Sequence, residues 1–205
     1  MDSITPTMNI EEALTMLEGT MAELRDTQAQ LAVAQAQLDE MNMLVFEQSA
    51  TDPLTGLKNR TAFERIMNQQ SARTGRTNAP LSLLMVDVDH LKTFNEEFGR
   101  VGGDDVLQKV AQVLKAHARA YDYVARYQSD EFAVVLPDTP LASAIIVAER
   151  VRNAINGIAW RHQGASVSVG VAESTSMEDG QTLVARACTA LSDAKNAGGN
   201  RVGNA

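Results

Sequence analysis

The chain has 205 residues, of which 44% are hydrophobic and 21% are charged. These values are typical of a packed globular protein, and they exclude a disordered chain, a collagen and a disulfide-rich scaffold. Eighteen Lys and Arg residues against 26 Asp and Glu residues give a net charge of -8. This acidity argues against nucleic acid or an anionic membrane as a partner, although a small polyphosphate can bind beside a metal ion or a few lysines.

The single cysteine, Cys188, excludes an internal disulfide. The first residues contain neither the basic region nor the apolar core of a signal peptide. No segment approaches the roughly 18 apolar residues that a membrane span needs. We therefore expect a cytoplasmic protein.

We expect residues 1–9 to form a flexible N-terminus and residues 10–50 to form one long dimerising helix. Its heptad segment, residues 10–48, would be about 58 Å long. Its seam residues alternate at spacings of four and three, which is the heptad pattern of a coiled coil. One column of the seam contains Ile10, Leu17, Leu24, Leu31, Leu38 and Val45, and the other contains Leu14, Met21, Gln28, Gln35 and Asn42. A parallel homodimer is predicted; the alternative is one amphipathic helix packed against its own domain.

A second domain is predicted from residue 51 to residue 205, because the turn at Asp52-Pro53 ends the long helix. Helices are expected at 62–70, 101–119, 141–158 and 182–197. Strands are expected at 81–88, 123–127, 132–136 and 165–171, with a polar loop at 74–80. The tight turn between the second and third strands requires antiparallel neighbours. This favours an α+β fold of the ferredoxin-like kind, with a mostly antiparallel sheet flanked by helices.

Two acidic clusters are candidates for a metal site. Asp87 and Asp89 stand where an apolar strand ends, and their oxygens are ligands that Mg²⁺ prefers. Asp89 is equally suited to cap a helix that begins at Leu91. Asp130 and Glu131 follow a predicted hairpin turn, where acidic residues are often only solvated. Sequence spacing does not show whether the two clusters lie together.

Several other residues have both a functional and a plain interpretation. Lys92 stands beside a predicted helix start, which is an arrangement that binds phosphate, or it is an exposed lysine. Asp104 either caps a helix or accepts hydrogen bonds from guanine, together with Asn95. Arg119 and Asp122 are three residues apart, a spacing that on a helix gives a weak surface pair.

Five segments, in this order, resemble the GGDEF family of diguanylate cyclases. They are TDPLTGLKNRTAF (51–63), VDVDHLKTFNEEFGRVGGDDVL (86–107), RAYDYVARYQSDEF (119–132), SVSVGVA (166–172) and ALSDAKNAGGNRV (190–202). The resemblance implies the fold of nucleotidyl cyclases, a cofactor of Mg²⁺ or Mn²⁺, and two facing domains that each bind one GTP. Each 3′-hydroxyl attacks the α-phosphate of the other GTP, which gives cyclic di-GMP and pyrophosphate.

The resemblance also implies roles for individual residues. The metal ligands are Asp87, the carbonyl of Val88, and Asp130. The residues assigned to catalysis are Asp130, Glu131 and Lys92. The residues assigned to substrate binding are Asn95, Asp104, Lys92, Lys195, Gln128 and Ser129. An inhibitory cyclic di-GMP site is formed by Arg119 and Asp122.

The main departure from the family pattern is Gln128-Ser129 in place of Gly-Gly. In a two-residue hairpin these positions have positive φ, so non-glycine residues are expected to cost about 1–2 kcal/mol. The side chain of Gln128 also adds bulk where the nucleotide would lie, and Gly199 stands where an arginine often contacts phosphate. We expect a diguanylate cyclase of low activity. The alternatives are an inactive domain that binds cyclic di-GMP or GTP, and a purely structural dimerisation protein.

Overall fold

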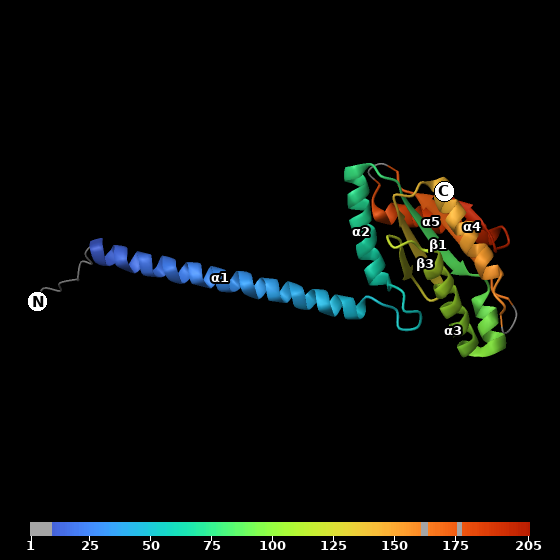
Figure 1. Cartoon of the computed structure of the whole chain (residues 1–205), viewed down its shortest axis with the longest axis horizontal. Coiled ribbons are helices and arrows are strands. Elements are labelled where there is room, and N and C mark those ends of the chain that lie inside the picture. The colour runs from blue at the N-terminus through green and yellow to red at the C-terminus, as the bar shows by residue number, and fades with distance from the viewer. Residues whose placement is uncertain (1–9, 161–163, 176–177) are drawn as a thin grey trace, which may run out of the picture. The chain divides into compact units, whose positions relative to one another are not determined.

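The computed structural model describes residues 10–160, 164–175 and 178–205, so the expected flexible N-terminus at 1–9 lies outside the described residues. The described chain divides into helix α1 (Ile10–Ser49) and a compact unit that begins at Ser49 (Figure 1). Among the described helices, none has the length and apolar character that crossing a bilayer requires.

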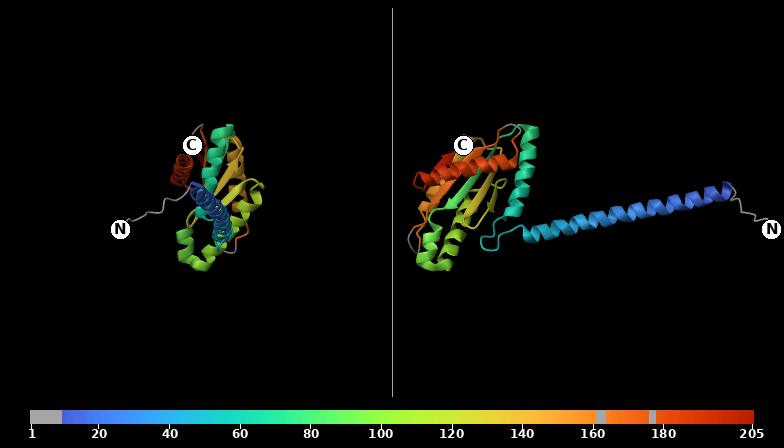
Figure 2. Two further views of the ribbon diagram at one scale, coloured as in Figure 1. Left: turned by 90° about the vertical axis from the view of Figure 1, so that its left-hand side faces the viewer. Right: turned by 180° about the vertical axis from the view of Figure 1, so that it is seen from behind.

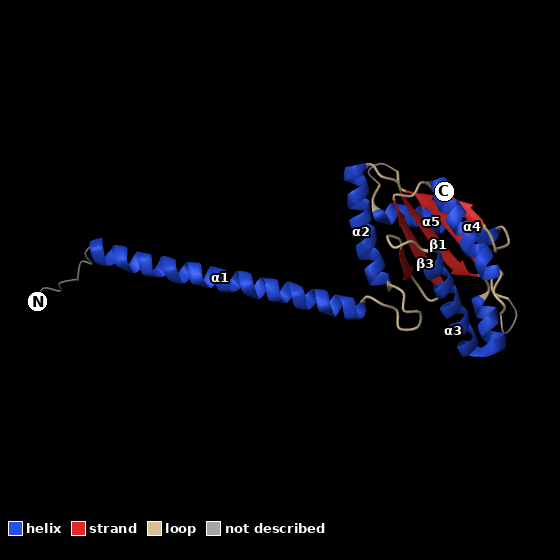
Figure 3. Ribbon diagram, in the orientation of Figure 1, coloured by secondary structure: helices blue, strands red, loops and turns tan. Residues whose placement is uncertain are grey.

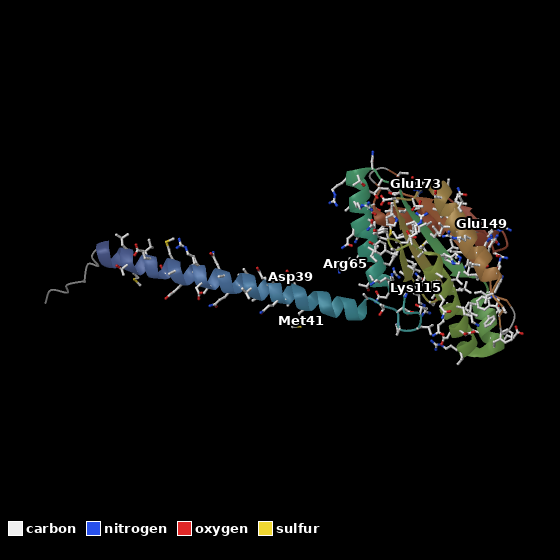
Figure 4. The ribbon with its side chains drawn as sticks, in the orientation of Figure 1. Asp39, Met41, Arg65, Lys115, Glu149 and Glu173 are labelled. Carbon is white, nitrogen blue, oxygen red and sulfur yellow. The ribbon has the colours of Figure 1, made fainter. Side chains whose placement is uncertain are left out.

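Helix α1 is continuous over 40 residues, as its heptad pattern predicts. Its apolar seam residues with described side chains are 48–60% exposed: Leu14, Leu17, Met21, Leu24, Leu31 and Leu38. Figure 4 shows side chains projecting outward along this helix, with Asp39 and Met41 labelled. An exposed leucine column of this length is a surface that a second helix can cover.

A five-stranded sheet forms the centre of the compact unit, in the order β2-β3-β1-β4-β5 (Figure 3). The strands are β1 (Leu81–Val88), β2 (Tyr123–Arg126), β3 (Glu131–Pro137), β4 (Val167–Glu173) and β5 (Val202–Asn204). β1 pairs antiparallel with β3 and β4, β2 pairs antiparallel with β3, and β5 runs parallel to β4. The expected α+β fold with a mostly antiparallel sheet is confirmed.

Four helices cover the two faces of this sheet (Figure 2). They are α2 (Arg60–Thr77), α3 (Leu91–His117), α4 (Leu141–Asn156) and α5 (Gly180–Asn196). Leu84 and Val86 pack in one core with α3 and α4, whereas Leu83 and Met85 pack in the other core with α2 and α5. Successive side chains of a strand point to opposite faces, so the central strand β1 is apolar at nearly every position.

Most element bounds differ from the sequence expectations by about two residues, but three elements differ more. α2 continues to Thr77, so most of the loop expected at 74–80 is helical, and the helix ends only where Asn78 adopts φ 56°. α3 starts at Leu91 instead of residue 101, because Gly99, with φ 75° and ψ 166°, joins two helical segments across a kink. β5 was not predicted, since three residues are too few to show a strand period.

Two close approaches hold the elements that carry the candidate site. A Cβ atom added to Gly170 of β4 would lie 2.1 Å from the carbonyl oxygen of Ala187, so α5 can rest on the sheet only because residue 170 is glycine. On the opposite side, the amide of Leu141 donates to the carboxylate of Glu173 at 2.7 Å, which caps α4 at the end of β4 (Figure 4). The first contact sets α5 against β4, and near the C-terminal end of α5 Nζ of Lys195 lies 2.7 Å from Oδ2 of Asp87 in β1.

Candidate active site

The candidate site lies where β1 ends beside the turn between β2 and β3. Asp87 is opposite Glu131 in the antiparallel register of β1 and β3. The amide of Val88 donates to the carbonyl oxygen of Asp130 at 3.3 Å. The two acidic clusters, which the sequence left unplaced relative to one another, therefore come together.

Asp87 is the most buried acidic side chain of this group, with 3% of it exposed. One oxygen, Oδ2, lies 2.7 Å from Nζ of Lys195, whereas the other, Oδ1, is buried and has no hydrogen-bond partner within the described part of the chain. Burial raises the pKa of Asp87 to about 6; Lys195 opposes this rise, and the charges of Asp130 and Glu131 add to it. A buried acceptor that faces further negative charge fits a bound cation.

Glu131 has a similar environment. Burial and the neighbouring charge of Asp130 raise its pKa above the ordinary value of 4.5. A carboxylate with a raised pKa accepts a proton more readily at neutral pH than an exposed one does.

The donor set is suited to Mg²⁺ or Mn²⁺. Carboxylate oxygens of Asp87 and Asp130 and the carbonyl of Val88 are hard ligands of the kind these ions take. Within the described part of the chain, no three His, Cys, Asp or Glu side chains are grouped closely enough to hold a metal ion on their own. A metal here would need further oxygens from a phosphate ligand or from water.

A cavity of about 320 Å³ brings four of the expected site residues together. Its lining consists of Leu91, Lys92, Asn95, Glu96, Ser129 and Asp130. Gln128 is exposed and lies outside this lining, and so does Asp104, which follows Gly103 beyond the kink of α3. A second cavity contains Lys195 together with Asp89, His90 and two glycines.

Asp89 does not cap α3, and that expectation is wrong. The N-cap residue is His90, which has φ 55° and makes no capping bond through its side chain. The carboxylate of Asp89 instead accepts from the hydroxyls of Ser166 and Ser168, both at 2.6 Å, and from the amide of Asn200 at 2.9 Å. It thus ties the end of β1 to β4 and to the turn before β5.

The strain expected at Gln128 and Ser129 is also absent. Among the described residues with positive φ, neither Gln128 nor Ser129 occurs. The connection from β2 to β3 has four residues instead of two, and the amides of Tyr127 and Gln128 both donate to the carbonyl of Glu131. Longer hairpin loops of this kind do not need the primed turns that require glycine.

An ion pair that sequence analysis missed supports this hairpin. Nη1 of Arg126 lies 3.2 and 3.1 Å from the two carboxylate oxygens of Asp52, and Nε of Arg126 donates to the carbonyl of Ser129 at 3.1 Å. Burial opposes ionisation of Asp52, but hydrogen bonds from Thr55 and the charge of Arg126 outweigh burial and lower its pKa. No spacing signal links positions 52 and 126.

We expect Asp52→Asn to lower the free energy of unfolding by about 1–3 kcal/mol at neutral pH, because Arg126 would keep its charge in a site that is only 17% exposed. Asp138→Asn is the control, since its pair with Arg73 is 44–54% exposed and should contribute less than about 1 kcal/mol. Urea unfolding measures both. The Asp52 effect should shrink as pH falls through its lowered pKa, and equal losses in the two variants would contradict the prediction.

Arg119 and Asp122 do not form the helical pair considered from their spacing. α3 ends at His117, and the two residues lie in the following turn, where the amide of Arg119 donates to Oδ2 of Asp122 at 2.7 Å. The Arg119 side chain is exposed, and it borders a cavity of about 400 Å³ together with Lys58 and Lys115, which is labelled in Figure 4. This cluster of positive charge suits an anionic ligand.

Residues 49–201 match the family model described as "Diguanylate cyclase, GGDEF domain". The chain belongs to the GGDEF family. It is 37% identical over 160 residues to "Diguanylate cyclase DgcP" of Pseudomonas aeruginosa, which covers 76% of this chain and 24% of DgcP. It is 35% identical over 163 residues to "Response regulator PleD" of Caulobacter vibrioides, which covers 76% of this chain and 36% of PleD. The chain thus spans well under half of the length of these GGDEF relatives.

Solved GGDEF structures extend the similarity to the helix. The coiled coil and GGDEF domain of DgcB from Caulobacter crescentus, in complex with c-di-GMP, has a TM-score of 0.76 at 29% identity and covers 91% of this chain and 99% of that one. The diguanylate cyclase SiaD from Pseudomonas aeruginosa, in complex with its activator SiaC, has a TM-score of 0.75 at 33% identity, with 95% and 78% covered.

Proposed function

We propose that this chain is a diguanylate cyclase that condenses two GTP molecules into cyclic di-GMP and pyrophosphate as a metal-dependent homodimer. The observation that carries the proposal is Asp87: among the described residues its buried Oδ1 has no hydrogen-bond partner, its Oδ2 lies 2.7 Å from Lys195, and the charges of Asp130 and Glu131 act on it. Family membership supplies the reaction, and this arrangement supplies a site able to perform it.

We assign the residues around the site to metal binding and to phosphate binding. Asp87, the carbonyl of Val88, and Asp130 would hold Mg²⁺ or Mn²⁺, which when bound supplies positive charge against the phosphate oxygens. Lys195 favours the ionised form of Asp87, which a cation requires. Lys92, on the cavity wall, is assigned to phosphate.

The remaining assignments concern the base and the attacking hydroxyl. Asn95 and Asp104 offer acceptors to the N–H donors of guanine. Asp130 and Glu131 are the assigned acceptors for the proton that leaves the 3′-hydroxyl, and the raised pKa of Glu131 suits that task. Gln128 and Ser129 border the nucleotide. Each domain binds one GTP, so condensation needs two copies facing each other.

The test is incubation of the purified protein with GTP and Mg²⁺ or Mn²⁺, followed by reverse-phase chromatography of the nucleotides. Cyclic di-GMP that appears with time, and not in the presence of EDTA, is the expected result. No product with either metal would reject the cyclase proposal.

A second candidate function is a receptor for cyclic di-GMP, and the exposed basic cavity beside Arg119 favours it. The same site would serve product inhibition in an active enzyme, with Arg119 and Asp122 as its assigned residues. Cyclic di-GMP that copurifies with the protein, without turnover of GTP, would favour the receptor. Loss of that copurified ligand in Arg119→Ala would assign it to this cavity.

We expect Leu24→Glu to weaken dimerisation by at least about a hundredfold, because it removes two buried leucines and sets two like charges against each other in a parallel pair. Val33→Glu is the control, since Val33 is 58% exposed but lies off the predicted seam. Sedimentation at micromolar concentration should show monomers for the first variant and dimers for the second. Equal behaviour of the two variants would contradict a dimer through this seam.

A further inference from the structure

Gly103 of α3 lies directly beneath the side chain of Asn95. The two residues are eight apart, a separation of about 12 Å along a straight helix. They meet because the kink at Gly99 turns the first segment of α3 against the second (Figure 1). A Cβ atom added to Gly103, which is buried, would lie 1.8 Å from Oδ1 and 2.8 Å from Cγ of Asn95. The carboxamide of Asn95 thus occupies the space that any other residue at 103 would fill.

The same carboxamide has an unmet acceptor. Oδ1 of Asn95 is buried and has no hydrogen-bond partner among the residues that the structure describes, and Asn95 borders the cavity that also contains Lys92 and Asp130. A buried acceptor without a donor is unfavourable in a folded protein unless a ligand supplies that donor. The 2-amino group and the N1–H of guanine are donors of this kind.

We propose that Gly103 is a positioning residue for base recognition. Because it has no side chain, it leaves free the space that the Asn95 carboxamide needs to adopt the orientation that accepts a hydrogen bond from guanine. This inference rests on the proposed binding of GTP and extends it to a residue that touches no ligand. The alternative is that Gly103 serves only the packing of α3. The two interpretations differ in which group moves when a Cβ atom is added at position 103. The end of the flexible Asn95 side chain moves more easily than the backbone of α3. Gly103→Ala should therefore turn Asn95 away and leave the fold intact.

The experiment compares Gly103→Ala, Asn95→Ala and the double variant with wild type. Calorimetry measures the affinity for a non-hydrolysable GTP analogue with Mg²⁺, and for the matching ITP analogue, which lacks the 2-amino group. We expect Gly103→Ala to weaken binding of the GTP analogue about tenfold, which corresponds to one lost hydrogen bond. The preference for the GTP analogue over the ITP analogue should fall but not vanish, because Asp104 remains as an acceptor. The double variant should bind like Asn95→Ala alone. Gly75→Ala in α2 is the control, because beyond its neighbours and the nearby backbone of its own helix no described atom lies within 4 Å of its added Cβ.

Each remaining outcome decides against the inference. Wild-type affinity and selectivity in Gly103→Ala would overturn it, as would a further loss in the double variant, because Gly103 would then act through something other than Asn95. A Gly103→Ala protein that unfolds at a clearly lower temperature than Gly75→Ala would show that the backbone gives way, and would also overturn it. If wild type binds neither analogue, the proposed function fails together with the inference. If wild type binds GTP but Gly103→Ala behaves like wild type, only the inference fails.

Discussion

Asp87→Asn is expected to lower the rate of cyclic di-GMP formation by at least about a hundredfold. The same substitution should make the metal-free protein more stable. The variant keeps the shape of the side chain but loses the negative charge that a cation needs. In the metal-free protein this charge is buried, and its Oδ1 has no partner. Removing it relieves an unfavourable burial. Lys195, whose side chain is 43% exposed, remains solvated when its partner is neutral.

The stability gain should depend on pH in a defined direction. The pKa of Asp87 is 3.8 in the unfolded reference and about 6 in the folded protein, so the folded state holds this proton more tightly. Wild type therefore loses stability as pH rises from about 4 to about 6, at roughly 1.4 kcal/mol per pH unit, and the loss is constant above that range. Asp87→Asn lacks this loss. Its advantage over wild type should grow to about 2–3 kcal/mol by neutral pH.

Urea unfolding in EDTA, at several pH values between about 4 and 7, measures that difference. Asp138→Asn, which removes an exposed carboxylate far from β1 in sequence, is the matched control for both activity and stability. A stability difference that does not change with pH would contradict the buried charge. Substantial product from Asp87→Asn would contradict its role as a metal ligand.

How far the sequence predicts this molecule is clearest in β1. Its boundaries at Leu81 and Val88 follow from a run in which every residue except Ser82 and Asp87 is apolar, because a central strand buries both faces and shows no alternation. α2 is the opposite case. Only Ala62, Phe63 and Met67 are buried, so the polar residues after Gln70 carry no sign that the helix continues to Thr77. The hydrophobic pattern of a sequence indicates which residues are buried. It therefore does not predict where an exposed end of a helix or strand stops.

In the candidate site, the sequence indicates single residues but not the contacts between residues that are far apart along the chain. The sequence indicates Asp87 and Asp130 separately, because Asp87 lies near the end of one apolar strand and Asp130 directly precedes another. Their proximity depends on the register of β1 against β3, which only the packed sheet fixes. The contacts of Asp89 with Ser166 and of Arg126 with Asp52 join residues that are 77 and 74 positions apart. Such partners emerge from tertiary packing, since neither pair has a characteristic spacing.

The hairpin at Gln128-Ser129 leads to the other large expected effect. Restoring glycine at both positions should raise the rate of cyclic di-GMP formation by about tenfold or more. Backbone strain contributes nothing to this expectation, because neither residue has positive φ. Two effects remain. Under the proposed function the exposed Gln128 side chain would add bulk beside the nucleotide, and the hydroxyl of Ser129 donates to Oδ1 of Asp130 at 2.8 Å. A carboxylate oxygen that already accepts a hydrogen bond competes less well for a metal ion.

Single variants separate these two effects. Ser129→Ala removes the hydroxyl but keeps Cβ, so a gain equal to that of Ser129→Gly would assign the effect to the bond with Asp130. A gain that appears only with Gln128→Gly would assign it to bulk. Initial rates at varied GTP and at varied metal concentration distinguish the two effects further. Relief of bulk lowers KM for GTP, whereas release of Asp130 lowers the metal concentration needed for half-maximal rate. No gain in any variant would mean that neither side chain limits the rate.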